Sequence, residues 1–357
     1  MSGSPPSSLS TIAARVERRL DTLLTAEHER WASFDPNLAH PMSEIRRLVM
    51  SGGKRLRPAF CTWGYVAAGG DETDQLVVDA GGALELMHAF ALFHDDVMDD
   101  AATRRGEPTT HALAAAEHAA SGWSGESRRF GDGVAILVGD LTFVYADQLL
   151  ADAPRTAWRI WNELRIELNI GQYLDIIGSV QRTRDLTTAE RICRYKSGKY
   201  TIERPLHLGA VLAAPERADD LLPALSAYGL PLGDAFQMRD DVMGAFGDTT
   251  LTGKPVGGDL IEGKPTPLLA RAVAAASATE LEVLDLVGRP GIDDEQVAAI
   301  QQVIVDTGAL DDLERTIAEL TDEAVRALDD AATTAPIAPA ADGALRELAV
   351  YVSSRAS

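Results

Sequence analysis

The sequence predicts an all-α protein built as a single large helical domain, and three observations indicate this class. From Leu9 to Arg355 the chain is rich in Ala, Leu and Glu, and its apolar residues recur at intervals of three and four, which is the period of an amphipathic helix. The sustained alternation of apolar and polar residues that is typical of strands is absent. The chain has 357 residues, of which 46% are hydrophobic, so it can bury a large core.

Five breaks rich in glycine, proline and short polar residues separate the expected helical segments, at residues 67–74, 121–133, 212–220, 246–267 and 332–343. The helical pattern fills the intervals between them. None of the breaks resembles a flexible domain linker, and no repeat with a period of about 20 to 50 residues recurs. We therefore expect a disordered tail at residues 1–10 and a single all-α domain over residues 11–357.

The chain is strongly acidic, with 33 lysine and arginine residues against 54 aspartate and glutamate residues and a formal net charge of −21. Most of its surface would repel the phosphate backbone of a nucleic acid, so we expect no nucleic-acid partner. The two cysteines, Cys61 and Cys193, are far apart and form no CxxC pattern, which argues against a disulfide framework and against a zinc site. This usage fits a reducing, cytoplasmic location.

Neither the N-terminus nor the most apolar window predicts a membrane segment. The first ten residues, MSGSPPSSLS, lack the basic region and the apolar stretch of a secretory signal. The window from Gln75 to His94 is the most apolar, but it contains Asp79, Glu85 and His88, so we interpret it as a buried core helix. The sequence therefore predicts a soluble protein without a membrane span.

The first acidic motif follows this window, in AFALFHDDVMDDAATRRG at residues 89–106. Asp95 and Asp99 are four residues apart and project from the same helix face, with Asp96 about 100° round the helix. A solvated helix end would explain an acidic cluster, but the preceding ALF indicates that the cluster opens from a packed wall. Oxygen ligands without a nearby cysteine suit Mg²⁺, which keeps several waters and is often completed by substrate phosphates.

A second aspartate pair, Asp240 and Asp241, occurs in FQMRDDVMGAFGD after another mainly apolar stretch. Gly244 stands where the first motif has Asp99, so this second site is weaker by one carboxylate. The two motifs predict two acidic sites, and two such sites can face each other.

Basic residues occur close to both acidic motifs. Any one of them alone would be interpreted as ordinary surface, but in so acidic a chain their conjunction with aspartate pairs suggests two phosphorylated substrates, one held through metal and one held directly. These residues are Lys54, Arg55 and Arg57 in SGGKRLRP, Arg104 and Arg105 after the first motif, Lys196 and Lys199 in YKSGKY, and Lys254 and Lys264 in the fourth break.

Two other patterns in the sequence are weaker evidence for a functional site. The segment GDLIEGKP has the glycine and lysine spacing of a nucleotide P-loop, but Pro265 replaces the hydroxyl residue and no strand precedes it, which excludes that motif. Gln172 and Asp175 in GQYLD lie in an otherwise apolar helix, where an internal hydrogen bond would satisfy them. They are candidates for lining a pocket.

Taken together and in this order, the motifs GGKRLRP, HAFALFHDDVMDDAATRRGEPTTH, GQYLD, YKSGKY, FQMRDDVMG and GKPVGGDLIEGKPTPL closely resemble those of the trans-prenyl diphosphate synthases. That family lengthens isoprenoid chains by five carbons at a time. The resemblance spans nearly the whole chain. It implies an all-α fold of the isoprenoid synthase type with a deep central cavity, two to three bound Mg²⁺ ions, and a homodimer. With this resemblance we expect Asp95 and Asp240 to face each other across the mouth of the cavity.

The resemblance also implies roles for individual residues. Two departures from the family's pattern are Gly244, where a third aspartate is frequent, and Ser197, where Thr is frequent. The implied metal ligands are Asp95 and Asp99, supported by Asp96, together with Asp240 and Asp241. The implied ligands of the allylic diphosphate are Arg104, Lys196, Lys254 and Lys264, those of isopentenyl diphosphate are Lys54, Arg57, His88 and Arg105, and Gln237 and Ser197 place dipoles near the developing cation.

The expected product is geranylgeranyl (C20) diphosphate, with farnesyl (C15) diphosphate as the alternative. Residues four and five before Asp95 form the cavity floor in the family, and here they are the small Ala91 and the aromatic Phe90. Two other classes remain as alternatives. A terpene cyclase would share the first motif but would need no second diphosphate site, and a non-catalytic subunit of a heteromeric synthase would keep the fold while its acidic motifs decay. The preferred allylic substrate and the downstream pathway stay open.

Overall fold

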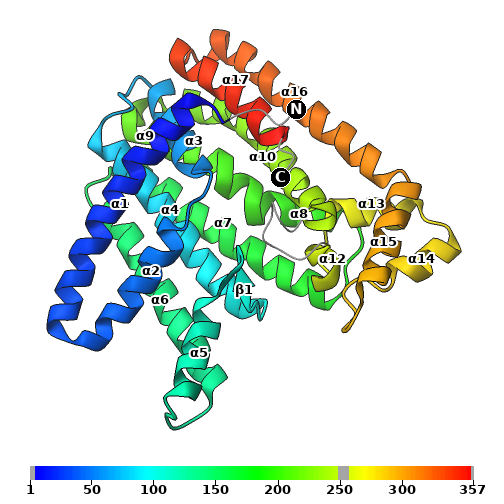
Figure 1. The fold of residues 1–357 in the computed structure, drawn as a ribbon. Helices are drawn as coiled ribbons and strands as arrows, with labels where there is room; N and C mark the ends of the chain where they lie inside the picture. The colour runs from blue at the N-terminus through cyan, green and yellow to red at the C-terminus, as the bar shows by residue number, and fades with distance from the viewer. Residues whose placement is uncertain (1–4, 248–256, 355–357) are drawn as a thin grey trace. The chain divides into compact units, whose positions relative to one another are not determined.

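The computed structural model describes residues 5–247 and 257–354, and the described chain is almost entirely helical (Figure 1). Its residues group into two compact units. The N-terminal unit comprises Ser7–Thr62 and Asp71–Pro154, and the C-terminal unit comprises Met1–Pro6, Trp63–Gly70 and Arg155–Ser357.

The helices of the N-terminal unit pack around α4 (Gln75–Met98). The others are α1 (Ser7–Phe34), α2 (Ala39–Met50) after a short 3₁₀ turn η1 (Pro36–Leu38), the first half of α3 (Leu56–Ala67), α5 (Thr110–Ala120) and α6 (Ser127–Leu149). Helix α4 contacts α1, α2, α5 and α6. A Cβ atom at Gly81 of α4 would lie 2.9 Å from Val16 Cγ2, so glycine is required where α1 crosses α4 this closely.

Helix α1 begins at Ser7, inside the stretch that the sequence assigned to a disordered tail. Leu9 and Ile12 of this first turn are both buried, because residues three apart lie on the same face of a helix. Burial of that apolar pair explains why the helix starts directly after Pro5 and Pro6.

The apolar helix α4 is buried over most of its length, as the sequence predicts for a core helix. It is long and apolar enough to cross a membrane by composition alone, and 61% of its most apolar window is buried within the protein. Core helices of soluble proteins pass the same test, so this burial favours the interpretation of α4 as a core helix.

A two-residue hairpin follows α4. Strands β1 (Thr103–Arg104) and β2 (Glu107–Pro108) pair antiparallel, with Arg104 opposite Glu107. The loop residues Arg105 and Gly106 have φ values of 54° and 79°, as a type I′ turn requires. This turn brings Arg104 and Arg105 back toward the acidic end of α4.

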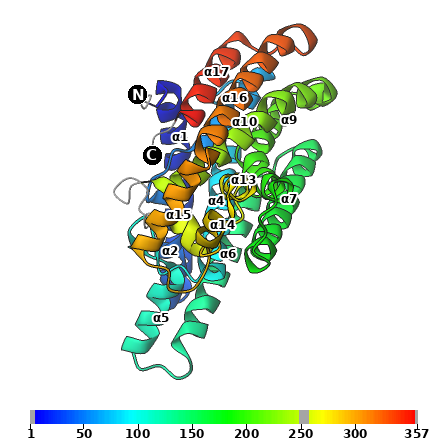
Figure 2. The same cartoon turned by 90° about the vertical axis from the view of Figure 1, so that its right-hand side faces the viewer.

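In the C-terminal unit the long helix α10 (Ala218–Phe246) contacts α16 (Ala309–Thr334) and the π-helical segment η2 (Arg194–Glu203). The remaining elements are α7 (Arg155–Val180), α8 (Leu186–Cys193), α9 (Arg204–Ala213), η3 (Pro215–Arg217), α12 (Gly258–Glu262), α13 (Pro267–Ala275), α14 (Ala278–Leu284), α15 (Asp294–Asp306) and α17 (Pro339–Ser353). Helices α16 and α17 lie side by side (Figure 2).

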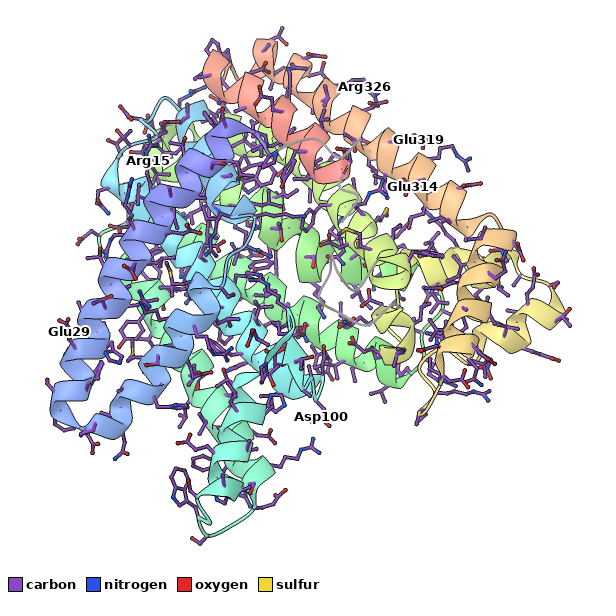
Figure 3. All side chains as sticks on the ribbon, viewed as in Figure 1. Arg15, Glu29, Asp100, Glu314, Glu319 and Arg326 are labelled. Carbon is purple, nitrogen blue, oxygen red and sulfur yellow. The ribbon has the colours of Figure 1, made fainter. Side chains whose placement is uncertain are left out.

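Helix α16 shows why these segments are helical. Leu313 and Ile317 are four residues apart and both are buried, whereas Glu319 and Arg326 are exposed (Figure 3). Glu314, beside the buried stripe, accepts two hydrogen bonds from Arg239 of α10, at 2.5 and 2.6 Å. The apolar stripe and this bidentate ion pair hold α16 against α10, the helix that carries the second aspartate motif.

Candidate active site

The first acidic motif lies at the C-terminal end of α4, where Arg104 reaches it from the hairpin. Arg104 Nε donates to Asp96 Oδ1 at 2.6 Å, and its Nη2 lies 3.4 Å from Asp95 Oδ2. The Asp99 amide donates to the Asp95 carbonyl at 2.8 Å, so these two residues are one helical turn apart. Asp95 and Asp99 therefore share a face, as the sequence predicts, and the third carboxylate is tied to the arginine.

The three carboxylates differ in exposure. Asp96 is buried, Asp95 is half-buried and Asp99 is exposed. Burial raises the pKa of the Asp96 carboxyl above its ordinary value, and the adjacent charge of Arg104 opposes that rise. Asp95 and Asp99 are thus the better placed pair to bind a metal from solution, and Asp96 fixes Arg104 beside them.

The positive charges of four arginines act on His88, which lies on α4 two turns before Asp95. Burial lowers the pKa of His88 well below its ordinary value, and the positive charges of Arg57, Arg105, Arg104 and Arg55 lower it further. Burial and the charges of Arg104, Arg55 and Arg57 likewise lower the pKa of the Arg105 guanidinium. Cations crowded to this degree favour binding of a polyanion.

The sequence suggests that Arg55 faces a phosphate together with Lys54 and Arg57, but the structure shows a different role for Arg55. Its guanidinium is buried and donates to Glu17 Oε1 at 3.0 Å, to Glu85 Oε2 at 2.5 Å and to the Val49 carbonyl at 2.6 Å. The φ value of Arg55 is 48°, a conformation that non-glycine residues seldom adopt without such anchoring. Arg55 therefore anchors the loop that contains Lys54 and precedes α3.

Arg105 contacts the same loop, the one that contains Lys54, from the hairpin after α4. Arg105 Nη1 donates to Ser51 Oγ at 3.1 Å and to the Gly52 carbonyl at 2.8 Å. The loop that contains Lys54 is therefore fixed both to the core of the unit, through Arg55, and to the hairpin, through Arg105.

Phe90 packs between two other rings of the N-terminal unit. Its ring centroid is 4.7 Å from that of His94, one turn along α4, and 4.7 Å from that of Phe143 on α6. Phe90 is five residues before Asp95, which places it about 140° round the helix from Asp95, and on this side of α4 it contacts α6. Sequence reasoning missed Phe143, because nothing local relates it to α4.

The second aspartate motif lies on α10 in the C-terminal unit. Asp241 is buried and accepts a hydrogen bond from Gln237 Nε2 at 2.8 Å. Burial raises the pKa of Asp241 well above its ordinary value, and the charges of Asp259, Asp240 and Asp175 raise it further. Negative charge concentrated in this way favours a bound cation.

Lys196 and Ser197 lie on the π-helical segment η2, which packs against its neighbours through backbone. A Cβ at Gly171 of α7 would lie 2.6 Å from Lys196 Cα, and a Cβ at Gly233 of α10 would lie 2.7 Å from the Gly198 carbonyl oxygen. Glycine is thus required on two helices that flank η2. Lys196 Nζ donates to Asp175 Oδ2 at 2.5 Å, which gives the GQYLD aspartate a partner on η2.

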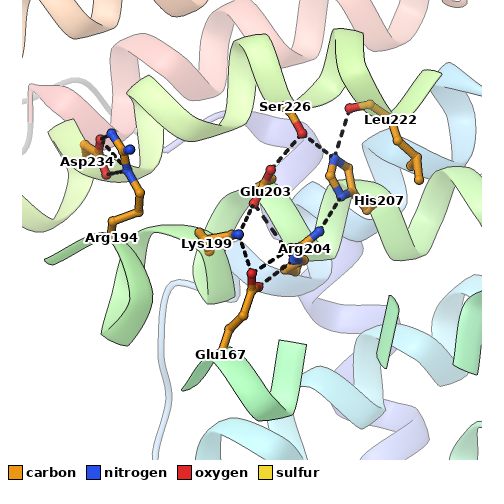
Figure 4. Close-up of polar contacts among 9 residues, drawn as sticks. All are labelled: Glu167, Arg194, Lys199, Glu203, Arg204, His207, Leu222, Ser226 and Asp234. Carbon is orange, nitrogen blue, oxygen red and sulfur yellow. Dashed lines mark hydrogen bonds and ion pairs between the residues drawn. The ribbon is translucent and has the colours of Figure 1, made fainter. Parts of the chain in front are cut away.

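A buried polar network holds the other end of η2 (Figure 4). Glu167 of α7 accepts from Lys199 and, at 2.6 and 2.7 Å, from Arg204. Glu203 accepts from Ser226 Oγ of α10 at 2.7 Å. Because each of these charged groups lies beside an opposite charge, their burial is tolerated and η2 is fixed in position. The sequence predicts a helix here but not its π-helical form.

The candidate residues fall into three groups. In the N-terminal unit are Lys54, Arg57, His88, Phe90, Ala91, Asp95, Asp96, Asp99, Arg104 and Arg105, and in the C-terminal unit are Lys196, Ser197, Gln237, Asp240, Asp241 and Lys264. Lys254 lies outside the described residues. The expectation that Asp95 faces Asp240 joins the two units and stays a prediction.

The donor chemistry of both acidic motifs fits Mg²⁺. Each offers carboxylate oxygens, and Mg²⁺ is commonly bound by one or two carboxylates together with waters and substrate phosphates. Among the residues that the structure describes, no group of three or more His, Cys, Asp and Glu side chains converges closely enough to hold a metal alone. A ligand set of this kind would be completed by the oxygens of a diphosphate.

Comparisons with known proteins agree with this chemistry. Residues 39–304 match the family model described as polyprenyl synthetase. The geranylfarnesyl diphosphate synthase of Aeropyrum pernix is 34% identical over 74% of this chain and 79% of its own length. The geranylgeranyl diphosphate synthase of Mycobacterium tuberculosis is 35% identical over 79% and 76%.

A solved structure is also similar to this chain over nearly its whole length. A geranylgeranyl pyrophosphate synthase from Corynebacterium glutamicum, complexed with isoprenyl diphosphate and magnesium, superposes with a TM-score of 0.89 at 36% identity, over 97% of this chain and 99% of that one. The all-α fold of the isoprenoid synthase type expected from the sequence is confirmed.

Proposed function

The chain belongs to the polyprenyl synthetase family and is a trans-prenyltransferase. We propose that it condenses isopentenyl diphosphate with an allylic diphosphate to give geranylgeranyl diphosphate, and that this reaction depends on Mg²⁺. The observation that carries this proposal is that the charges of Arg57, Arg104 and Arg105 act on His88, on the helix whose C-terminal end bears Asp95 and Asp99. A site for a polyanion and a site for a divalent cation thus lie within one unit.

Diphosphate leaves only when its charge is neutralised, and bound Mg²⁺ supplies that neutralisation. In the N-terminal unit Asp95 and Asp99 would hold the metal, and Arg104 would bind the allylic diphosphate oxygens. In the C-terminal part of the chain Asp240 would hold metal, and Lys196, Lys254 and Lys264 would bind the same diphosphate. The allylic C–O bond then breaks and its electron pair leaves with the diphosphate. Gln237 and Ser197 direct dipoles at the carbocation that results.

Lys54, Arg57, His88 and Arg105 hold isopentenyl diphosphate by its diphosphate. Its double bond attacks the allylic cation, the new carbon–carbon bond forms, and the proton lost goes to the departed diphosphate. The low pKa of His88 keeps its ring neutral near pH 7, so the ring donates one hydrogen bond without adding charge. Apolar walls exclude water, which would otherwise quench the cation.

The assignment of a C20 product rests on residues upstream of Asp95. Ala91 is small and does not block a growing chain near the metal, whereas Phe90 fills space together with Phe143. Purified protein with radiolabelled isopentenyl diphosphate, offered dimethylallyl, geranyl or farnesyl diphosphate separately, tests the proposal. A C20 product supports it. A C15 or C25 product overturns the chain length, and failure to incorporate label overturns elongation, in favour of a cyclase or a non-catalytic subunit.

We also propose a homodimer. Helix α6 exposes Ile136, Leu137 and Val144, with 65% of Leu137 accessible, and α7 exposes a stripe at Ile166, Ile170, Tyr173, Ile176 and Val180. Exposed apolar residues repeated along one helix mark an interaction surface. Light scattering on the purified protein tests this, and a monomer at micromolar concentration would contradict it.

The remaining assignments are a single helical domain that includes α1 from Ser7, two to three Mg²⁺ ions per active site, and a cytoplasmic location without a membrane span. The free and buried state of Cys61 and Cys193 supports the last of these. Unfolding in one cooperative transition would support the single domain. Metal titration in the presence of pyrophosphate tests the number of Mg²⁺ ions, and fractionation of cells that express the tagged chain tests the location.

A further inference from the structure

Lys264, a proposed ligand of the allylic diphosphate, has two carboxylates of the chain beside its ammonium group. Lys264 Nζ lies 2.5 Å from Glu262 Oε2 and 3.4 Å from Asp259 Oδ1. All three residues belong to one short segment of the C-terminal unit, α12 and the turn that follows it. A diphosphate that binds Lys264 must therefore compete for this cation with a carboxylate of the protein.

The two carboxylates differ in how readily a diphosphate can displace them. The Asp259 side chain is 13% exposed, whereas that of Glu262 is 37% exposed. Lys196, another proposed ligand of this diphosphate, pairs with Asp175, whose side chain is 10% exposed. Water solvates an exposed carboxylate that loses its partner, but it does not reach a buried one. Glu262 is therefore the carboxylate that gives up its lysine with the smallest penalty.

We propose that Glu262 is a displaceable counter-ion of Lys264, which pairs with this lysine until diphosphate binds and which promotes the release of diphosphate afterwards. This inference rests on the proposed function, because it concerns the same diphosphate site. Each condensation leaves inorganic pyrophosphate, which must depart before the next allylic substrate binds. A carboxylate that competes for Lys264 weakens the binding of substrate and of pyrophosphate alike, and it takes no part in the bond changes.

The backbone around the pair is fixed, so the exchange needs only rotation of side chains. Gly263 ends α12 with a φ of 76°, and the Gly263 and Lys264 amides both donate to the Asp259 carbonyl at 3.0 Å. A Cβ atom at Gly263 would lie 2.8 Å from Gly288 Cα, so glycine is required where these two segments touch. The turn fixes the backbone of Lys264, while its flexible stem lets the ammonium group move from Glu262 to a diphosphate.

Binding of inorganic pyrophosphate in the presence of Mg²⁺, measured by isothermal titration calorimetry on the purified protein, tests the inference without turnover. Glu262→Gln removes the charge and keeps the size of the side chain. We expect it to bind pyrophosphate about 2- to 5-fold more tightly than the wild type, the range that corresponds to an ion pair exposed to water. The matched control is Glu282→Gln, the same change at an exposed residue of α14, which should leave the affinity unchanged.

A double-mutant cycle shows whether the effect depends on Lys264. Lys264→Met should weaken pyrophosphate binding, and in that background Glu262→Gln should have a much smaller effect than in the wild type. In steady-state kinetics Glu262→Gln should lower the KM for the allylic substrate and the inhibition constant of pyrophosphate by similar factors. It should not raise kcat, because an interaction shared equally by ground state and transition state does not speed the chemical step.

The outcomes separate this inference from the function on which it rests. If Lys264→Met binds pyrophosphate as tightly as the wild type, the assignment of Lys264 to the diphosphate is itself wrong. If Lys264→Met loses affinity while Glu262→Gln binds pyrophosphate as the wild type does or more weakly, only the role of Glu262 is overturned. An equal gain from Glu262→Gln with and without Lys264 also overturns that role, because the contact with the lysine would then be irrelevant.

Discussion

Replacement of Glu85 by alanine should destabilise the N-terminal unit and weaken binding of isopentenyl diphosphate. The side chains of Glu85 and Arg55 are only 5% and 4% exposed, so the substitution leaves a buried guanidinium without its closest counter-ion. Removal of one partner of a buried ion pair costs about 3 to 5 kcal/mol. Because Arg55 keeps Glu17 and the Val49 carbonyl as acceptors, we expect a loss of about 3 kcal/mol, the lower end of that range.

The matched control is Glu17→Ala, which removes the other carboxylate bound to Arg55. Glu17 is 37% exposed, so water replaces much of the interaction and the expected cost is about 0.5 kcal/mol. Free energies of unfolding from urea titration, monitored by circular dichroism, compare the two variants. Steady-state kinetics should show a raised KM for isopentenyl diphosphate in Glu85→Ala, because Lys54 and Arg57 flank Arg55, and a smaller change in the KM for the allylic substrate. Equal costs for the two variants would refute the argument from burial.

Three further results are expected. Asp95→Ala should lose nearly all activity while its circular dichroism spectrum and unfolding midpoint stay close to those of the wild type, and normal turnover would remove Asp95 from the metal site. Phe90→Ala and Phe143→Ala should each shift the products toward longer chains on radio-chromatography, since the two rings pack together, and an unchanged distribution in both would place the floor elsewhere. Burial lowers the pKa of His207 to about 4, so the unfolded chain binds more protons between that value and about 6.5, and stability should fall as the pH drops through this range. The same pH titration of His207→Gln should show a shallower fall, and an identical slope would exclude His207 as the cause.

Features that depend on neighbours in the sequence could be predicted. The helical period identified α4 as a buried core helix, and the spacing of Asp95 and Asp99 placed them on one face, because a helix fixes the direction of side chains three and four residues apart. The proximity of Arg104 to the first motif followed from its position a few residues beyond the helix end. Sequence also indicated Gly244 as a departure from the first motif.

Features that depend on distant residues could not be predicted in the same way. Arg55 was grouped with the phosphate-binding cations, and only its contact with Glu85, 30 residues away, shows that it anchors the loop. One signal was present, since a glutamate within an apolar helix requires a buried partner. For Phe143 the sequence holds no comparable signal, because its contact with Phe90 arises from packing between helices.

The π-helical form of η2 depends on packing against other helices, and the local periodicity of the sequence gives no information about that packing. A π-helix is rarer than an α-helix and persists where the surroundings determine it. Here the backbone of η2 meets Gly171 on one side and Gly233 on the other, and the network of Glu167, Lys199 and Arg204 fixes its C-terminal half. Any side chain at Gly171 or Gly233 would displace η2, and with it Lys196 and Ser197. The position of two proposed substrate-binding residues therefore depends on glycines that contact no substrate, which is why neither glycine could be recognised as functional from the chain alone.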